Sequence, residues 1–314
     1  MKKLLTAALT AGLLFSSQMA NAKEKMTLLL DWFVNPDHAA IIVAQQKGYF
    51  ADNGLEVEIV EPADPSMPPK LVAAGQADLA VDYQPQLQLA VANGLPIVRV
   101  GTLVSTPLNT LTFLESSGIK SLADLKGKKI GYSVSGFEDA LLTAMLSNVG
   151  LSVKDVEKVN VNWSLSPSLI SGKVDAIVGG YRNFELNQLM IENHPGKAFY
   201  PEEHGVPVYD ELILVAKKEG MPTAKIKAFL TALEQATIYT LNHPDEAWKL
   251  FVSYKPKELD NELNRRAWKD TLPRLTHRPR ALDETRYEQM AEFLKQHGLT
   301  DKVLPLADYA VQVK

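Results

Sequence analysis

A turn near the start of the chain combines side chains that could hold a small molecule. Residues 31–38 read Asp-Trp-Phe-Val-Asn-Pro-Asp-His, which places an indole, an amide, carboxylates and an imidazole close together. The turn follows an apolar strand and precedes a helical segment, and such turns face the ligand crevice of open α/β sheets. We therefore expect Trp32, Asn35 and His38 to line half of a binding site.

Three later turns could supply the other half. Tyr83 follows a short apolar strand, residues 135–137 (Ser-Gly-Phe) open a helix, and Tyr181 and Glu185 are four positions apart. That spacing, at the start of a predicted helix, would place Tyr181 and Glu185 on one helix face. Aromatic rings would stack on a flat ligand, each pair contributing roughly 0.5–1.5 kcal/mol beyond area burial. Backbone N–H groups at 135–136 could instead bind an anion.

These candidates also have structural interpretations. Trp32 could cover the core, Tyr83 could pack within its turn, and Asn35 and His38 could only cap the first helix. Asp31 is expected to be structural. The residue types leave both interpretations open. The candidate ligand-binding residues at the four turns are Trp32, Asn35, His38, Tyr83, Ser135, Gly136, Phe137, Tyr181 and Glu185.

No enzyme signature accompanies these residues. The sequence lacks G-x-S-x-G, G-x-x-x-x-G-K-[ST], H-E-x-x-H and G-x-G-x-x-G, and its six histidines show no metal-ligand spacing. The absence of cysteine excludes disulfides, cysteine-ligated zinc, iron–sulfur clusters and a thiol nucleophile. We therefore predict that the protein is not an enzyme and holds no metal and no cofactor.

Two α/β units are expected to position the turns. Strands are predicted at 27–30, 55–60, 77–81 and 97–100, alternating with helices at 39–47, 70–74 and 86–92, and this alternation implies a parallel sheet. After a polar crossover at 102–110, strands are predicted at 111–114, 130–134, 159–161 and 174–178, with helices at 136–148, 165–170 and 181–192. A strand at 208–216 is expected to return to the first unit. Helices at 222–241, 245–253, 257–268 and 283–297 complete the chain.

The N-terminus reads as an export signal. Lys2 and Lys3 precede a short apolar run, and Ala20-Asn21-Ala22 forms an A-x-A cleavage site. The net charge of −4 becomes −6 once the two lysines of that segment are removed, which argues against a nucleic-acid partner. Without cysteine the mature chain cannot carry a lipid anchor, so we expect an unanchored periplasmic protein.

Several segments resemble the substrate-binding proteins of ABC importers. They are D-W-x-x-N-x-x-H at 31–38, A-x-x-K-G-Y-F at 44–50, G-L-E-V-E-I at 54–59, G-Q-A-D-L-A at 75–80, L-K-G-K-K-I-G-Y at 125–132 and G-K-V-D-A-I at 172–177. The first segment more closely resembles the group that binds the thiamine pyrimidine precursor. That group is related to the eukaryotic enzyme that makes the phosphorylated pyrimidine. The resemblance covers roughly residues 26–255.

The resemblance implies an α/β fold of the type II periplasmic-binding class, with two α/β lobes joined by two crossovers. Residues 23–104 and 208–314 would form lobe 1, residues 105–207 lobe 2, and residues 1–22 the signal peptide. The implied ligand is an aminopyrimidine such as N-formyl-4-amino-5-aminomethyl-2-methylpyrimidine. The binding residues of the family map onto Trp32, Asn35, Tyr83, Tyr181 and Glu185, and the crossover residues Tyr209 and Asp210 are expected to reach the cleft.

The chain departs from the synthase branch of this family. That branch carries a C-C-C-F-C segment, and it has a lysine and a histidine where this sequence has Asp82 and Gln86. We therefore expect a monomeric solute-binding protein that closes on an aminopyrimidine and delivers it to an ABC permease. The alternatives are another small ligand, such as a sulfonate or a flavin, and the synthase reaction.

Overall fold

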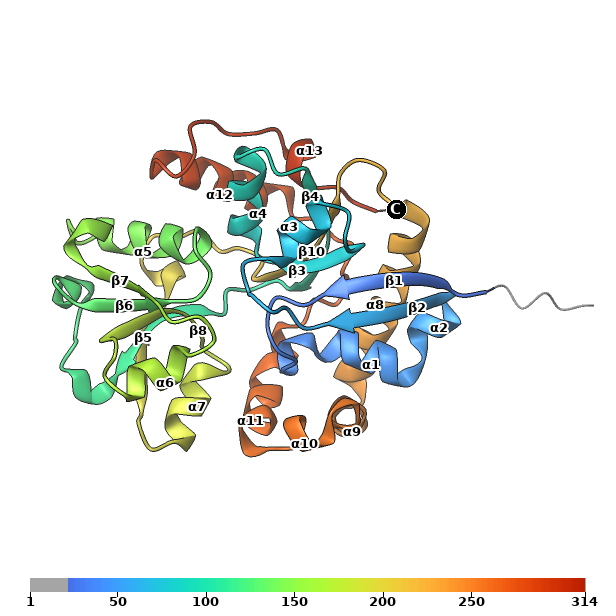
Figure 1. Ribbon diagram of the computed structural model, residues 1–314, viewed down its shortest axis with the longest axis horizontal. Coiled ribbons are helices and arrows are strands. Elements are labelled where there is room, and N and C mark those ends of the chain that lie inside the picture. Colours follow the sequence, from blue (N-terminus) through green and yellow to red (C-terminus); the bar gives the residue numbers. More distant parts are fainter. Residues whose placement is uncertain (1–21, 314) are drawn as a thin grey trace, which may run out of the picture.

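The computed structural model describes residues 22–313, which form two α/β lobes lying side by side (Figure 1). The predicted signal peptide, except for its last residue, lies outside the described residues. Lobe 1 is built on a sheet of order β2-β1-β3-β10-β4 and lobe 2 on a sheet of order β7-β6-β8-β5-β9. In the part of the chain that the structure describes, no helix is both long and apolar enough to span a bilayer.

The sheet of lobe 1 mixes parallel and antiparallel strands. β1 (Glu24–Leu29) pairs in parallel with β2 (Leu55–Val60) and with β3 (Leu79–Asp82). β10 (Leu212–Lys217) lies between β3 and β4 (Ile97–Val104) and is antiparallel to both. The late strand therefore returns to lobe 1 as expected, and the four strands predicted between residues 27 and 101 run in one direction. The sheet as a whole is mixed because β10 enters from the second crossover and separates β3 from β4.

The helices of lobe 1 follow the strands closely. Its elements are the 3-10 helix η1 (Pro36–His38), α1 (Ala39–Lys47), α2 (Tyr49–Asp52), α3 (Pro68–Ala73) and α4 (Gln84–Ala92). Residues 39–44 of α1 are buried, and the helix ends at Gly48, whose φ of +84° is favourable for glycine. The buried start of α1 holds the preceding turn, residues 31–38, rigidly against the core.

Lobe 2 also mixes parallel and antiparallel strands, with β5 antiparallel to both of its neighbours. β6 (Lys129–Tyr132) is parallel to β7 (Glu157–Asn160) and β8 (Ala176–Tyr181), while β5 (Asn109–Leu114) is antiparallel to β8 and to β9 (Gly196–Phe199). β9 was not predicted from the sequence. The helical elements are η2 (Glu115–Ser117), η3 (Leu122–Leu125), α5 (Phe137–Ser147), η4 (Val153–Asp155), α6 (Leu165–Ile170), α7 (Glu185–Ile191) and η5 (Pro201–Glu203).

The predicted start of the last helix of lobe 2 is wrong. Tyr181 is the final residue of β8, paired with Asn109 on β5, and α7 begins only at Glu185. Gly179, with φ of +102°, lies at a register shift between β8 and β5, and β8 continues beyond it to Tyr181. Tyr181 and Glu185 therefore meet through a loop and not on one helix face.

The chain after β10 is mainly helical and packs on lobe 1 (Figure 1). It contains α8 (Thr223–Asn242), α9 (Pro244–Tyr254), α10 (Pro256–Leu259), α11 (Glu262–Thr271), η6 (Leu272–Arg274), α12 (Glu284–Gln296) and α13 (Leu306–Tyr309). The helix predicted at 257–268 is divided, because Asn261 is extended (φ −140°) and its side chain caps the Asn264 N–H. The apolar face of α8 is buried as its spacing indicates, and Phe229 stacks on Phe50 at 4.9 Å.

Candidate ligand-binding site

A cavity lies between the lobes, at the edges where β1, β3, β6 and β8 end. The free volume within it is about 30 Å³, roughly the share of one water molecule in the liquid, so a ligand ring must displace side chains that now fill it. Both lobes contribute to it. The lining residues are Asp31, Trp32, Asn35, Asp37, His38, Tyr83, Asn109, Ser133, Val134, Phe137, Glu138, Leu165, Gly179, Tyr181, Phe184, Glu185 and Leu212.

Asp31 fixes the wall that lobe 1 contributes. Its Oδ1 accepts from His38 Nε2 at 2.8 Å, and its Oδ2 accepts from the Tyr83 hydroxyl at 2.9 Å. His38 Nδ1 accepts from the Asn35 N–H at 3.3 Å, so the ring proton belongs on Nε2. The Asn35 side chain accepts from the Asp37 N–H at 2.8 Å and caps η1. His38 is therefore a buried hydrogen-bonding residue that orients Asp31, and Asp31 in turn orients Tyr83.

Aromatic rings meet across the gap between the lobes. Tyr83 of lobe 1 stacks on Phe137 of lobe 2, with ring centroids 4.9 Å apart and an interplanar angle of 11°. Trp32 contacts Trp163 at 4.4 Å. Aromatic rings of this kind pack well against a planar, apolar ligand ring. Trp163 was not predicted as a binding residue. It follows β7 within Asn162-Trp163-Ser164, which matches a glycosylation motif, and that motif has no relation to ligand binding.

A buried carboxyl group faces the cavity from lobe 2. Glu185 Oε2 accepts from the Tyr181 N–H at 2.6 Å, and Glu185 is 7% exposed. Burial raises the pKa of Glu185 to about 7, against the lowering effect of its backbone hydrogen bonds. The Tyr181 hydroxyl is buried and has no hydrogen-bond partner within residues 22–313. This wall can therefore accept hydrogen bonds from a ligand edge through the Glu185 carboxylate and donate one through the Tyr181 hydroxyl.

Glu138 organises the loop that precedes α5. Its Oε2 accepts from the Ser133 N–H at 2.7 Å and the Val134 N–H at 3.1 Å, and burial raises its pKa well above the usual value. Gly179 lies against this carboxyl group with φ of +102°, and a Cβ there would collide with Glu138 Oε1. Glycine at 179 thus permits the close approach of β8 to Glu138. Glu138 was not predicted as a site residue, because the sequence marks it only as a residue near the start of a helix.

The structure gathers most, but not all, of the sequence candidates. Those that line the cavity are Trp32, Asn35, His38, Tyr83, Phe137, Tyr181 and Glu185. Ser135 and Gly136 are exposed, and neither is among the lining residues. Phe137 alone of that turn points inward, because it starts the buried face of α5.

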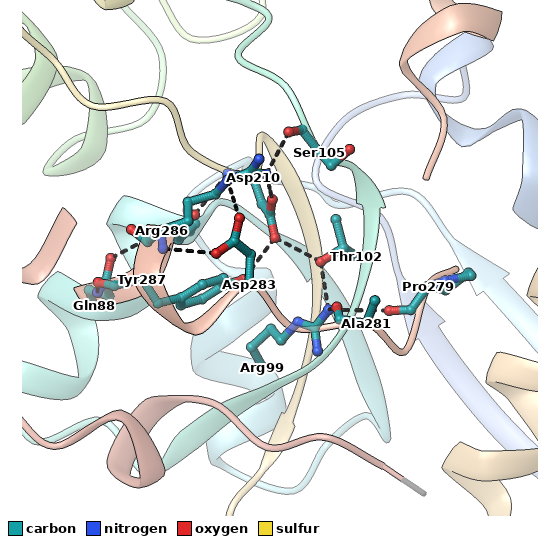
Figure 2. A network of polar contacts seen from close by, with 11 residues as sticks. Gln88, Arg99, Thr102, Ser105, Asp210, Pro279, Ala281, Asp283, Arg286 and Tyr287 are labelled. Carbon is teal, nitrogen blue, oxygen red and sulfur yellow. Dashed lines mark hydrogen bonds and ion pairs between the residues drawn. The ribbon is translucent and has the colours of Figure 1, made fainter. Parts of the chain in front are cut away.

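Asp210 is buried in a polar network (Figure 2). It is not among the residues that line the cavity. Its Oδ1 pairs with the guanidinium of Arg286 on α12, and its Oδ2 accepts from the Thr102 hydroxyl at 2.9 Å and the Tyr287 hydroxyl at 3.2 Å. Arg286 also donates to the Ser105 carbonyl at 2.7 Å. Residues 105 and 210 belong to different crossovers, so Arg286 ties both connections between the lobes. Tyr209 is fully buried and also lies outside the lining residues.

The two lobes, the two crossovers and the cavity between them define the periplasmic-binding-protein fold. The alkanesulfonate-binding protein of Xanthomonas axonopodis pv. citri bound to MOPS superposes with a TM-score of 0.72, at 16% identity over 92% of this chain and 98% of that chain. A Candida albicans protein with the generic periplasmic-binding fold gives a TM-score of 0.72, at 18% identity over 93% and 97% of the two chains. These similarities establish the fold.

The chain belongs to the NMT1/THI5-like family, whose model matches residues 35–247. It is 66% identical to a Haemophilus influenzae protein named for thiamine biosynthesis, over 93% of both chains. It is 36% identical to the formylaminopyrimidine-binding protein of Halalkalibacterium halodurans, over 74% of this chain and 71% of that protein. It is 30% identical to a 4-amino-5-hydroxymethyl-2-methylpyrimidine phosphate synthase of Saccharomyces cerevisiae, over 77% and 74%. The family therefore contains both binding proteins and synthases.

Proposed function

We propose that the protein is the periplasmic solute-binding component of an ABC importer and captures a thiamine-related aminopyrimidine between its lobes. The observation that carries this proposal is the inter-lobe cavity, whose walls combine aromatic rings of both lobes with the buried carboxyl group of Glu185. The formylaminopyrimidine-binding relative supports the ligand class. The periplasmic location rests on the sequence of residues 1–22.

The ring faces of a pyrimidine suit the aromatic walls. Trp32 and Tyr83 come from lobe 1 and Phe137 and Tyr181 from lobe 2. A flat ring that took the place of the direct contact between Tyr83 and Phe137 would stack on both lobes. Ring contacts of this kind contribute roughly 0.5–1.5 kcal/mol each beyond area burial. A ligand that touches both lobes favours the closed arrangement, and its release to a permease requires the crossovers to bend.

The amino edge of the pyrimidine suits Glu185. Ligand N–H groups that donate to the carboxylate would favour its ionised form and offset the burial that raises its pKa to about 7. A charge-assisted hydrogen bond is roughly twice as strong as a neutral one. An analogue without the amino group would leave the buried carboxyl group unpaired and would bind less tightly.

The alternatives fit the cavity less well. A sulfonate requires positive charge or several N–H donors, and the lining residues include neither lysine nor arginine. The synthase branch carries a cysteine-rich segment and a lysine–histidine pair, whereas this sequence has no cysteine and has Asp82 and Gln86 at the paired positions. We therefore propose ligand binding by a monomer and delivery to a permease, without catalysis.

Mass spectrometry of the molecule that co-purifies with the protein tests the ligand class. The protein would be isolated from its own periplasm without unfolding, and the small molecule released by denaturation. We expect a 4-amino-2-methylpyrimidine, identified by its exact mass and fragmentation. A sulfonate or a flavin at similar occupancy would contradict the aminopyrimidine assignment.

A further inference from the structure

Asp37 joins three parts of the molecule through one carboxylate oxygen. Asp37 lies in η1 of lobe 1, and its Oδ1 accepts from Asn183 Nδ2 of lobe 2 at 2.6 Å and from the Thr271 hydroxyl at the end of α11 at 3.1 Å. Asn183 Nδ2 also lies 2.8 Å from the Thr271 hydroxyl oxygen. All three side chains are buried, with exposed fractions of 2% or less. These bonds link the lobes behind the binding turn.

The second oxygen of Asp37 has no such partner. Asp37 lines the cavity, and its Oδ2 is buried without a hydrogen-bond partner in residues 22–313. A buried carboxylate oxygen left unpaired is costly, because water no longer solvates it. Desolvation accordingly raises the pKa of Asp37 to about 6, although the hydrogen bonds from Asn183 and Thr271 act to lower it. A donor from the cavity side would remove this penalty.

We propose that Asp37 couples ligand capture to lobe closure, with a ligand N–H donating to Oδ2 while Oδ1 holds Asn183 and Thr271. The proposal rests on the proposed function, because aminopyrimidines supply N–H donors on a planar ring. Asn183 can reach Asp37 only when lobe 2 lies against lobe 1. A ligand donor stabilises the charged carboxylate, and the charged carboxylate is the stronger acceptor for both bonds on Oδ1. Ligand and closure therefore strengthen each other through one side chain.

This role makes Asp37 a specificity-determining residue distinct from Glu185. Glu185 accepts from a backbone N–H within its own lobe, whereas the partners of Asp37 come from lobe 2 and α11. A ligand without a donor at this position would leave Oδ2 unpaired in the closed protein. Rejection of such analogues would then appear as failure to close.

Asp37→Asn is the direct test, because it preserves shape and one acceptor oxygen but replaces the other oxygen with a donor. We expect affinity for 4-amino-5-hydroxymethyl-2-methylpyrimidine to fall by ~10–100-fold, as for the loss of one charge-assisted hydrogen bond. Thr271→Val keeps both oxygens of Asp37 and removes one closing bond, so we expect a smaller fall of ~3–10-fold. The unfolding midpoint of each variant without added pyrimidine verifies that it is folded.

The matched control is Asp270→Asn. Asp270 also joins the lobes, since its Oδ2 accepts from Asn187 Nδ2 at 2.8 Å, but this contact is exposed and lies outside the cavity. We expect the affinity of Asp270→Asn for the pyrimidine to stay within about twofold of wild type, since exposed pairs contribute little. Equal affinities of Asp37→Asn and Asp270→Asn would overturn the proposal.

A second readout separates this proposal from the choice of ligand. Native mass spectrometry of the proteins, isolated without unfolding, gives the fraction that carries any bound small molecule. We expect lower occupancy in Asp37→Asn than in Asp270→Asn, whatever the molecule is. A different molecule in the wild type would contradict the aminopyrimidine assignment while still testing Asp37. Equal occupancy of the two variants, or a wild type that binds neither a co-purified molecule nor the pyrimidine, would refute the role of Asp37.

Discussion

Asp210→Ala is expected to lower the free energy of unfolding by about 3 kcal/mol, because truncating one member of a buried ion pair leaves the other uncompensated. The change would leave the Arg286 guanidinium and the Thr102 and Tyr287 hydroxyls without their common acceptor. Asp210 is 3% exposed, so water cannot replace it easily. Urea unfolding at constant pH measures the effect.

The control for this prediction is Asp283→Asn, which removes the charge but keeps an oxygen that can cap the Arg286 N–H at the start of α12. Asp283 also pairs with Arg286, at 3.7 Å, but its side chain is 55% exposed. Exposed pairs typically contribute less than about 1 kcal/mol, so this variant should remain close to wild type. If both variants lost equal stability, the buried network would not be what anchors the second crossover to lobe 1.

Stability is expected to fall as the pH rises from about 5 to about 8. Burial raises the pKa of Glu185 and of Glu211 to about 7 and that of Asp37 to about 6. In this range the folded state binds more protons than the unfolded state, so the free energy of unfolding decreases with pH. For Glu211, whose ordinary pKa is 4.5, the decrease amounts to about 3 kcal/mol at about 1.4 kcal/mol per pKa unit. Urea unfolding at intervals of one pH unit would measure it.

Glu211→Gln removes the contribution of Glu211 to the pH dependence of stability. Glu211 Oε2 accepts from the Leu108 N–H at 2.6 Å and the Asn109 N–H at 2.9 Å, and a glutamine oxygen can accept both bonds. The variant should therefore fold and show a flatter decrease between pH 5 and pH 8. Glu292→Gln, at an exposed position of α12, should keep the wild-type slope. A slope unchanged in Glu211→Gln, or a stability that rises with pH, would contradict the assigned titration.

The sequence predicted the fold well where local patterns decide the outcome. Residues 39–47 and 55–60 form the expected helix and strand, because an apolar run before Gly48 and an alternating L-E-V-E-I-V segment leave few alternatives. The sheet order was not accessible in the same way. The insertion of β10 between β3 and β4 depends on long-range pairing after the chain has passed through lobe 2.

The site residues were predicted from the turns that follow strands. The prediction is wrong where tertiary contacts determine which side chains face the cavity. Trp32 and Tyr83 carry a visible signal, since each is an aromatic residue that follows a strand. Ser135 and Gly136 also follow a strand, yet they are exposed in the loop whose preceding backbone N–H groups donate to Glu138. Asp37 carried no separate signal, because its partners Asn183 and Thr271 are distant in sequence.

The central claim is that the inter-lobe cavity binds a thiamine-related aminopyrimidine with Glu185 at its polar edge. Isothermal titration calorimetry of the ligand-stripped protein with N-formyl-4-amino-5-aminomethyl-2-methylpyrimidine tests it most directly. We expect one site per chain, and affinity reduced ~10-fold in Glu185→Gln, because a charge-assisted hydrogen bond becomes a neutral one. If titration of the wild-type protein at high concentration released or absorbed no heat, the ligand assignment would be contradicted. Unchanged affinity in Glu185→Gln would remove Glu185 from the site.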